Sequence, residues 1–115
     1  MSFGYSHGIP RDADVVLDCR FLPNPHWVEG LRAHTGLEKE VSSFVLGHDE
    51  AMLFLNDAVG MLSWQIPLFA REGKTYFSIA LGCTGGKHRS VAMAEELSQR
   101  LGVGVTVFHR DVDRP

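Results

Sequence analysis

Features that mark several large protein classes are missing from this chain of 115 residues. It has only two cysteines, Cys19 and Cys83, which are too few for the disulfide framework of a small secreted domain and fit a reducing compartment. No apolar run approaches the length of a membrane-spanning helix, and the first residues lack the pattern of a signal peptide. We therefore expect a cytoplasmic protein that does not contact a membrane.

A basic excess is also missing. The formal net charge is −3, with 11 Lys and Arg residues against 14 Asp and Glu residues. Since neutralisation of phosphates dominates the affinity of proteins for nucleic acids, this balance argues against RNA or DNA as the main ligand. The Cys and His residues lack the paired spacing of a zinc site, so no metal site is predicted.

Four β-prone runs alternate with helical patterns along the chain. The runs cover residues 2–6, 14–19, 75–81 and 103–108, and the second and third are apolar enough for strands that are covered on both faces. This alternation predicts an α/β fold, a single-domain sandwich with a mostly parallel sheet of about four strands and flanking helices. At 44% hydrophobic residues, one domain over residues 1–115 can form a core without cross-links.

Three segments are predicted to be helical. The longest covers residues 49–69, with Asp49 as its cap and an apolar stripe formed by Met52, Leu55, Val59, Leu62 and Ile66. A second helix covers residues 88–101 and ends before Gly102. A shorter helix is expected over residues 24–33, with Pro25 at its first position.

The segment from Gly82 to Ser90 is the most informative part of the sequence. A buried strand, a glycine-rich turn and a helix follow one another directly, an order that aims backbone N–H groups and the helix dipole at one point. The glycines permit close approach to a ligand, and Lys87 and Arg89 supply mobile positive charge. We expect an anionic ligand here, held by Cys83, Thr84, Gly85, Gly86, Lys87, His88, Arg89 and Ser90.

Other polar residues follow the remaining predicted strands. If the sheet is parallel, the carboxyl ends of its strands lie along one edge, which adds Asp18 and Arg20 to the site. His7, His109 and Arg110 are predicted at its rim. His26 is placed in the same site, and Trp27 is read either as a flat ligand surface or as a plug in the core.

Cys83 and Arg89 also have the spacing of the cysteine-dependent phosphatase loop. In that loop a thiolate attacks phosphorus while the arginine holds the phosphoryl oxygens, and Asp18 is placed to act as the general acid. Gly82 stands where that class of enzyme has a histidine, and no mobile acid loop is evident. Phosphatase activity is therefore the alternative to ligand binding without turnover.

The same loop resembles the C-terminal domain of the bacterial RapZ/YvcJ family. The resemblance rests on Gly82-Cys-Thr-Gly-Gly-Lys-His-Arg-Ser-Val91, on Asp18-Cys-Arg20-Phe-Leu-Pro-Asn-Pro-His26-Trp27, and on His7-Gly8-Ile9-Pro10, Thr35-Gly36-Leu37 and His109-Arg110. Such landmarks span nearly the whole chain. Full-length members add an N-terminal P-loop domain that uses ATP and GTP. Its Gly-x-x-x-x-Gly-Lys-Ser/Thr motif does not occur here, so we expect that domain to be absent and this one to need no cofactor.

The resemblance implies a regulatory domain that senses an amino-sugar phosphate such as glucosamine-6-phosphate and signals to a small RNA or a regulatory protein. The pocket residues that it implies are Asp18, His26, Cys83, Thr84, Gly85, His88 and Arg89. RNA-binding members have a lysine where this chain has Ser6, and a basic tail where it has Asp111-Val-Asp-Arg-Pro115. Both differences remove positive charge and weaken the expectation of an RNase-adapter role. A homo-oligomer is left open.

Overall fold

A computed structural model describes all residues from Met1 to Pro115. Its central feature is a parallel sheet of three strands in the order β1-β3-β2, formed by Ser2–Gly4, Ile79–Cys83 and Val15–Asp18 respectively. The register pairs Gly4 with Cys83 and Asp18 with Gly82, so all three strands end at the same edge. The predicted parallel sheet and its shared carboxyl edge are therefore confirmed.

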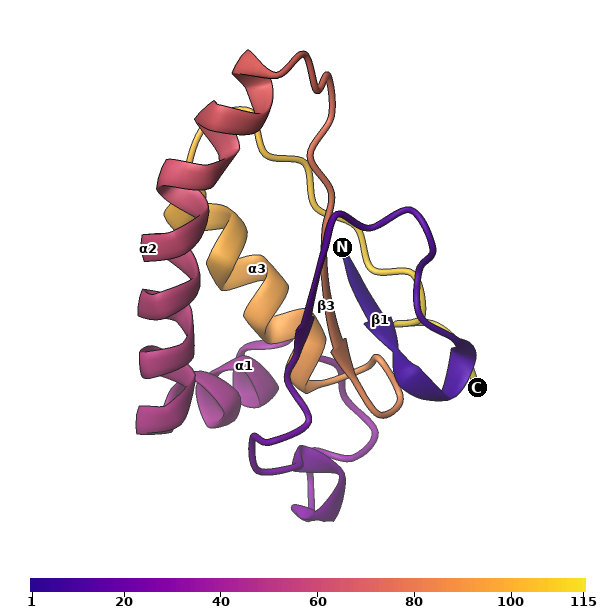
Figure 1. The fold of residues 1–115 in the computed structure, drawn as a ribbon. Helices are drawn as coiled ribbons and strands as arrows, with labels where there is room; N and C mark the ends of the chain where they lie inside the picture. Colours follow the sequence, from indigo (N-terminus) through magenta and orange to yellow (C-terminus); the bar gives the residue numbers. More distant parts are fainter.

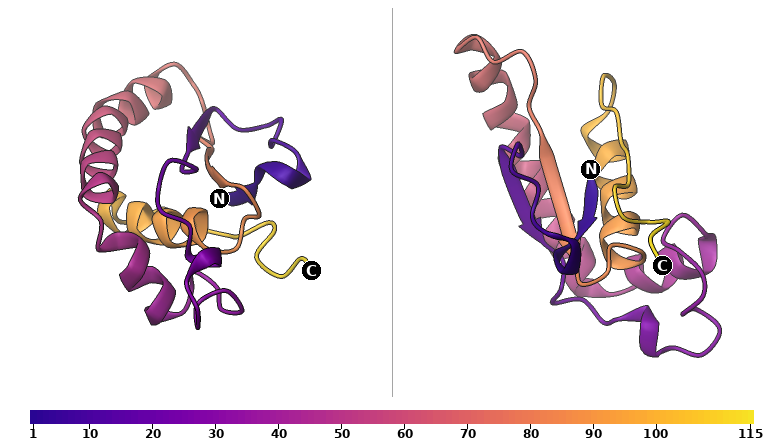
Figure 2. Two further views of the ribbon diagram at one scale, coloured as in Figure 1. Left: turned by 90° about the horizontal axis from the view of Figure 1, so that it is seen from below. Right: turned by 90° about the vertical axis from the view of Figure 1, so that its right-hand side faces the viewer.

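Helices α1 (Lys39–Leu46), α2 (Asp49–Arg71) and α3 (Arg89–Leu101) lie on one side of the sheet, to the left of the strands in Figure 1. Helix α3 packs directly against β1 and β3, while α1 and α2 pack against α3. The core includes the predicted apolar stripe of α2, with Leu55 and Leu62 fully buried. The end of α2 and the following loop project beyond the strands (Figures 1 and 2).

Two parts of the predicted fold are wrong. The sheet has three strands instead of four, because residues 103–108 form no strand and only His109 makes an isolated bridge, to Ser2. Glycines with positive φ at positions 102 and 104 turn this segment, and Val103 and Phe108 are exposed. The sandwich is not observed either. Since helices cover one face only, β2 alternates between half-buried and exposed residues, and Val16 is 40% exposed.

Several element boundaries also differ from the prediction. The first strand stops at Gly4, where the 3-10 turn η1 (Tyr5–His7) begins, and β3 runs to Cys83, two residues past its predicted end at Leu81. The predicted helix over residues 24–33 shortens to the 3-10 turn η2 (Pro25–Trp27), because Val28 is extended and Gly30 has a φ of 88°. Pro25 does occupy the start of that turn.

The helices show two further differences. Asp49 is the first residue of α2 and not its cap, a position that still places negative charge at the positive end of the dipole. Helix α1 was not predicted, although Val41 and Val45, four residues apart, are both fully buried. No helix of the structure is both long and apolar enough to span a lipid bilayer.

Candidate functional site

The loop between β3 and α3 is held in place by its carbonyl groups. The amide of Ser6, just after β1, donates to the carbonyl oxygen of Thr84 at 3.0 Å, and the amide of Gly36 donates to that of Lys87 at 2.8 Å. Both donors come from distant segments that flank the loop on either side. Because these carbonyl groups bond outward to the rest of the protein, the loop is anchored without using its own N–H groups.

Those N–H groups have no partner within the protein. From Thr84 to Ser90, no main-chain amide donates a hydrogen bond to a backbone carbonyl or to a side chain. The last of them belong to the first turn of α3, where the helix dipole adds partial positive charge. A run of unpaired amides at a helix N-terminus is the main-chain arrangement that binds phosphate and carboxylate groups.

Arg89 is fixed beneath this loop and is not the mobile cation that the sequence indicates. Its side chain is buried, with 5% of its surface exposed. Nη1 donates to the carbonyl oxygens of Arg20 at 2.8 Å and Leu22 at 3.0 Å, and Nη2 donates to Thr84 Oγ1 at 3.3 Å. Nε is buried and has no hydrogen-bond partner. Nε and Nη2 form the edge of a guanidinium that pairs with two oxygens of one oxyanion.

Cys83 and Ser90 meet at the inner side of the loop. Cys83 ends β3, Ser90 is the second residue of α3, and the Cys83 Sγ lies 3.1 Å from the Ser90 Oγ. Both side chains are buried. The sequence placed the Ser90 hydroxyl among the groups that bind the ligand, whereas the structure places it against the thiol.

Asp18 and Arg20 lie beside the loop, at the end of β2. The Arg20 guanidinium pairs with the Asp18 carboxylate, with Nη2 to Oδ2 at 2.7 Å, and lies 3.7 Å from the centre of the Tyr5 ring. The hydrogen bonds from Arg20 lower the pKa of Asp18 below its usual value. Asp18 is therefore a carboxylate at neutral pH, which suits it to bind a cation or a hydroxyl group.

His88 and His26 are linked through one segment. The His88 ring is buried and lies with Nε2 3.1 Å from the carbonyl oxygen of Arg32, whose Nε in turn donates to the carbonyl oxygen of His26 at 2.8 Å. Burial lowers the pKa of His88, so its ring is neutral at pH 7 and donates from Nε2. His26 and Trp27 are both exposed, so Trp27 is not a plug in the core.

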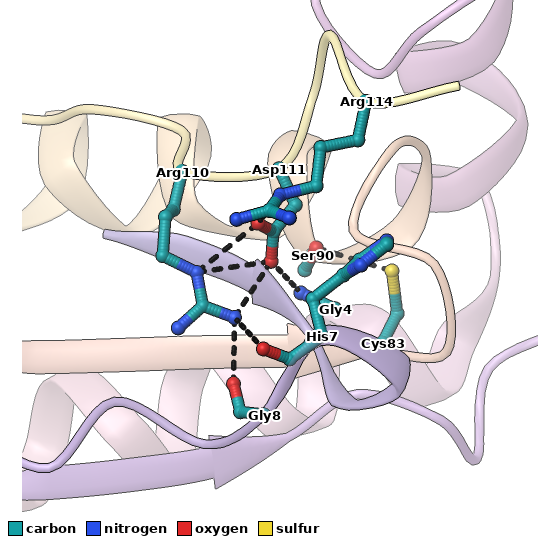
Figure 3. A network of polar contacts seen from close by, with 8 residues as sticks. All are labelled: Gly4, His7, Gly8, Cys83, Ser90, Arg110, Asp111 and Arg114. Atoms are coloured by element: carbon teal, nitrogen blue, oxygen red, sulfur yellow. Dashed lines mark hydrogen bonds and ion pairs between the residues drawn. The ribbon is translucent and has the colours of Figure 1, made fainter.

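A carboxylate that sequence reasoning missed supports the loop from the other side. Asp111 is fully buried and accepts a hydrogen bond from the Gly4 amide at 2.7 Å, while Arg110 and Arg114 both form ion pairs with it (Figure 3). Since Gly4 pairs with Cys83 in the sheet, this network lies next to the Cys83–Ser90 contact. In the sequence Asp111 counted only as negative charge in a tail, and no local signal marks it as buried.

The predicted rim residues divide into two groups. Arg110 donates from Nη2 to the carbonyl oxygens of His7 at 3.3 Å and Gly8 at 2.6 Å, so it ties His7 to the Asp111 network. His109 points elsewhere, because its ring contacts the Ser2 hydroxyl and the Glu95 carboxylate, and its side chain is 8% exposed. His109 is thus separated from the other predicted site residues.

Gly86 is required by the close approach of two chain segments. Its φ is +80°, and an added Cβ would lie 2.6 Å from the Gly4 nitrogen and 2.9 Å from the Asp111 Cβ. We expect Gly86→Ala to lower the free energy of unfolding by roughly 2–4 kcal/mol in a denaturant titration, from the left-handed backbone and the overlap.

Gly85→Ala is the matched control, because a Cβ at position 85 would meet nothing within 4 Å and the backbone is not left-handed there. We expect its midpoint to stay close to that of the parent protein. Equal losses in both variants would show that the contact between Gly86 and Gly4 does not limit stability.

A mostly apolar hollow with a volume of about 760 Å³ lies away from this loop. It lies between the end of α2, the beginning of β3 and residues 103–108, and most of the residues that line it are hydrophobic. Lys74, the single Lys or Arg residue that lines it, pairs with the Asp14 carboxylate at 2.8 Å. The unpartnered Nε of the buried Arg89 therefore favours the loop Gly82–Ser90 over this hollow as the anion site.

Comparison with known proteins finds relatives that match nearly the whole chain. The family model described as "RapZ C-terminal domain" matches residues 1–113. Proteins named "nucleotide-binding protein" are 57% identical in Frankia alni, 55% in Streptomyces griseus and 53% in Mycolicibacterium smegmatis, over 99%, 99% and 98% of this chain. The chain spans 40%, 35% and 40% of the length of these relatives respectively.

Proposed function

Because this chain belongs to the RapZ C-terminal domain family, we propose that it is a regulatory domain that binds a small phosphorylated metabolite at the loop Gly82–Ser90. One observation carries the proposal: every amide from Thr84 to Ser90 is unpaired, next to the free Nε of the buried Arg89. Amides and a guanidinium edge within one loop are donors only, so they suit a ligand group with several acceptor oxygens. A phosphate monoester is such a group.

The rest of the site supports an amino-sugar phosphate such as glucosamine-6-phosphate. Asp18 is the register partner of Gly82 and therefore flanks the loop. Its carboxylate can accept hydrogen bonds from an ammonium or hydroxyl group once Arg20 turns aside. The exposed pair of His26 and Trp27, with ring centroids 4.8 Å apart, offers a further surface for a sugar ring.

The relatives are named nucleotide-binding proteins, and a nucleotide also presents a phosphate group. Since this chain spans only 40% of the length of the Frankia alni protein, nucleotide binding by that protein need not involve this loop. We propose that this domain uses no cofactor of its own. The two ligand classes share the phosphate and differ in the part that Asp18 would contact.

The charge around the loop bears on the partner that receives the signal. Arg110 and Arg114, the basic residues of the C-terminal segment, both pair with Asp111. Each pair reduces the positive charge that an RNA backbone would meet, and Ser6 adds none. We therefore propose a regulatory protein as the partner in preference to a small RNA, which remains the rival.

Titration calorimetry with four ligands tests the proposed function. Inorganic phosphate and glucosamine-6-phosphate should bind, with the sugar phosphate tighter by about tenfold for one added charged contact. AMP should bind like phosphate alone, and a short single-stranded RNA should give no heat at moderate salt. Absence of binding by every phosphate compound would rule out the proposed function, and tight RNA binding would favour the rival.

A further inference from the structure

We propose that Cys83 is a nucleophile toward phosphorus, so that the domain hydrolyses phosphate monoesters with a good leaving group, such as aryl or acyl phosphates. This inference goes beyond ligand sensing but rests on the same phosphate site.

The thiol lies where the loop amides begin. Cys83 is the last residue of the central strand and Arg89 is the first residue of α3. The unpaired amides run from Thr84 to Ser90, and the Cys83 Sγ lies 3.1 Å from the hydroxyl of Ser90, the last residue of that run. Cys83 itself is 2% exposed, while Thr84 and Gly85 next to it are exposed and open the loop to solvent.

Ser90 is placed to stabilise the thiolate. Its hydroxyl oxygen lies 3.1 Å from the Cys83 Sγ, and both atoms are buried, so the hydroxyl can donate to a negatively charged sulfur. A hydrogen bond to a charged group is stronger than one between neutral groups. The second cysteine has no such support, since burial raises the pKa of the Cys19 thiol and keeps it protonated. Of the two thiols, the structure favours only Cys83 as a nucleophile.

In the first step the Cys83 sulfur forms a bond to phosphorus while the bond from phosphorus to the leaving oxygen breaks. The loop amides and the Nε–Nη2 edge of Arg89 hold the three other oxygens. In the second step water attacks phosphorus, the S–P bond breaks, and the Asp18 carboxylate takes one proton from the water. Phosphate and the free thiolate result, so no oxidant, reductant or further reactant is needed.

The protonation state of Asp18 determines which leaving groups can depart. It is deprotonated and paired with Arg20, so it does not supply a proton to a departing alkoxide. An aryl or acyl phosphate leaves as a stable anion without that proton, whereas a sugar phosphate does not. The site therefore binds sugar phosphates without consuming them, which is compatible with a sensor.

Release of nitrophenol from para-nitrophenyl phosphate tests the proposal. Cys83→Ser should lower kcat by more than about 100-fold and keep the affinity for inorganic phosphate, while Cys19→Ala should leave kcat within about threefold. Ser90→Ala, which alters a positioning residue, should lower kcat about tenfold at unchanged KM. Acid-quenched parent protein should carry one phosphoryl group on the Cys83 peptide in a mass spectrum, a measurement that needs no variant.

If the parent protein and Cys83→Ser do not differ in turnover and no phosphoryl-cysteine forms, the assignment of Cys83 as a nucleophile is overturned. If phosphate still binds, the proposed sensing function stands. Absence of both turnover and phosphate binding overturns both proposals. Equal turnover of para-nitrophenyl phosphate and glucosamine-6-phosphate would disprove the selectivity argued from Asp18.

Discussion

Replacement of Arg89 by lysine should weaken the binding of inorganic phosphate by roughly 100-fold or more, since two charge-assisted hydrogen bonds are lost at about 1.5 kcal/mol each. The Nε–Nη2 edge of Arg89 can hold two oxygens at once, whereas a lysine ammonium acts as a point charge. Lysine also cannot reproduce the bonds from Nη1 to the carbonyl oxygens of Arg20 and Leu22. Calorimetry with phosphate measures the loss.

Arg100→Lys on the same helix is the matched control. Arg100 is exposed and pairs with Glu96 one turn earlier, an interaction worth about 0.3–0.5 kcal/mol. We expect this variant to bind phosphate like the parent protein. Circular dichroism should first show that Arg89→Lys and the parent protein are folded to the same extent. If Arg89→Lys then binds phosphate within about twofold of the parent affinity, the role assigned to the guanidinium edge is contradicted.

Removal of the Asp111 carboxylate should cause a large loss of stability. Asp111→Ala leaves the Gly4 amide without its acceptor and frees two arginines from their shared partner, at an expected cost of about 3 kcal/mol in the free energy of unfolding. Denaturant titration measures the change. Asp113→Ala, two residues along and exposed, should cost less than about 0.5 kcal/mol. Similar values for the two variants would show that the buried network contributes little.

The Asp111 carboxylate should also make the stability of the fold depend on pH. Burial acts to raise the pKa of Asp111, but the Arg110 side chain, the Gly4 amide and the charge of Arg114 outweigh it, so the net pKa lies below the ordinary value of 3.8. A lowered pKa in the folded state stabilises the fold above the unfolded pKa, and this contribution is lost as pH falls through the folded pKa. The stability difference between parent and Asp111→Asn should therefore be constant near pH 6 and shrink below about pH 4. A constant difference down to pH 2 would contradict the assignment.

The fold could be predicted as far as its local patterns reach. Continuous apolar character around Ile79 and the three- and four-residue spacing in α2 identified a buried strand and a helix, and both are present. Residues 103–108 misled because alternating β-prone residues form a strand only when a neighbouring strand pairs with them. The outer edge of β1 offers one bridge, at Ser2, and no more. Pairing with a neighbouring strand also explains why β3 continues two residues beyond its predicted end, because Cys83 pairs with Gly4 of β1.

The candidate site shows the same division. Cys83, the glycines and Arg89 were recognisable as one loop because strand, turn and helix follow one another within a few residues. The fixed position of Arg89 was not, since its carbonyl partners lie 69 and 67 residues away in sequence. Asp111 was hidden for the same reason, because its bond to the Gly4 amide spans 107 residues.

The amino-acid sequence alone determined that a loop rich in backbone donors joins a buried strand to a helix, because turn propensity and helix polarity depend on neighbouring residues. It also determined the distance along the chain between the thiol and the guanidinium. Only the tertiary structure decided that the loop amides stay unpaired, that Arg89 is immobile and that a buried carboxylate supports the sheet edge. Those properties depend on which distant carbonyl, amide and charged groups the packing brings within hydrogen-bond distance.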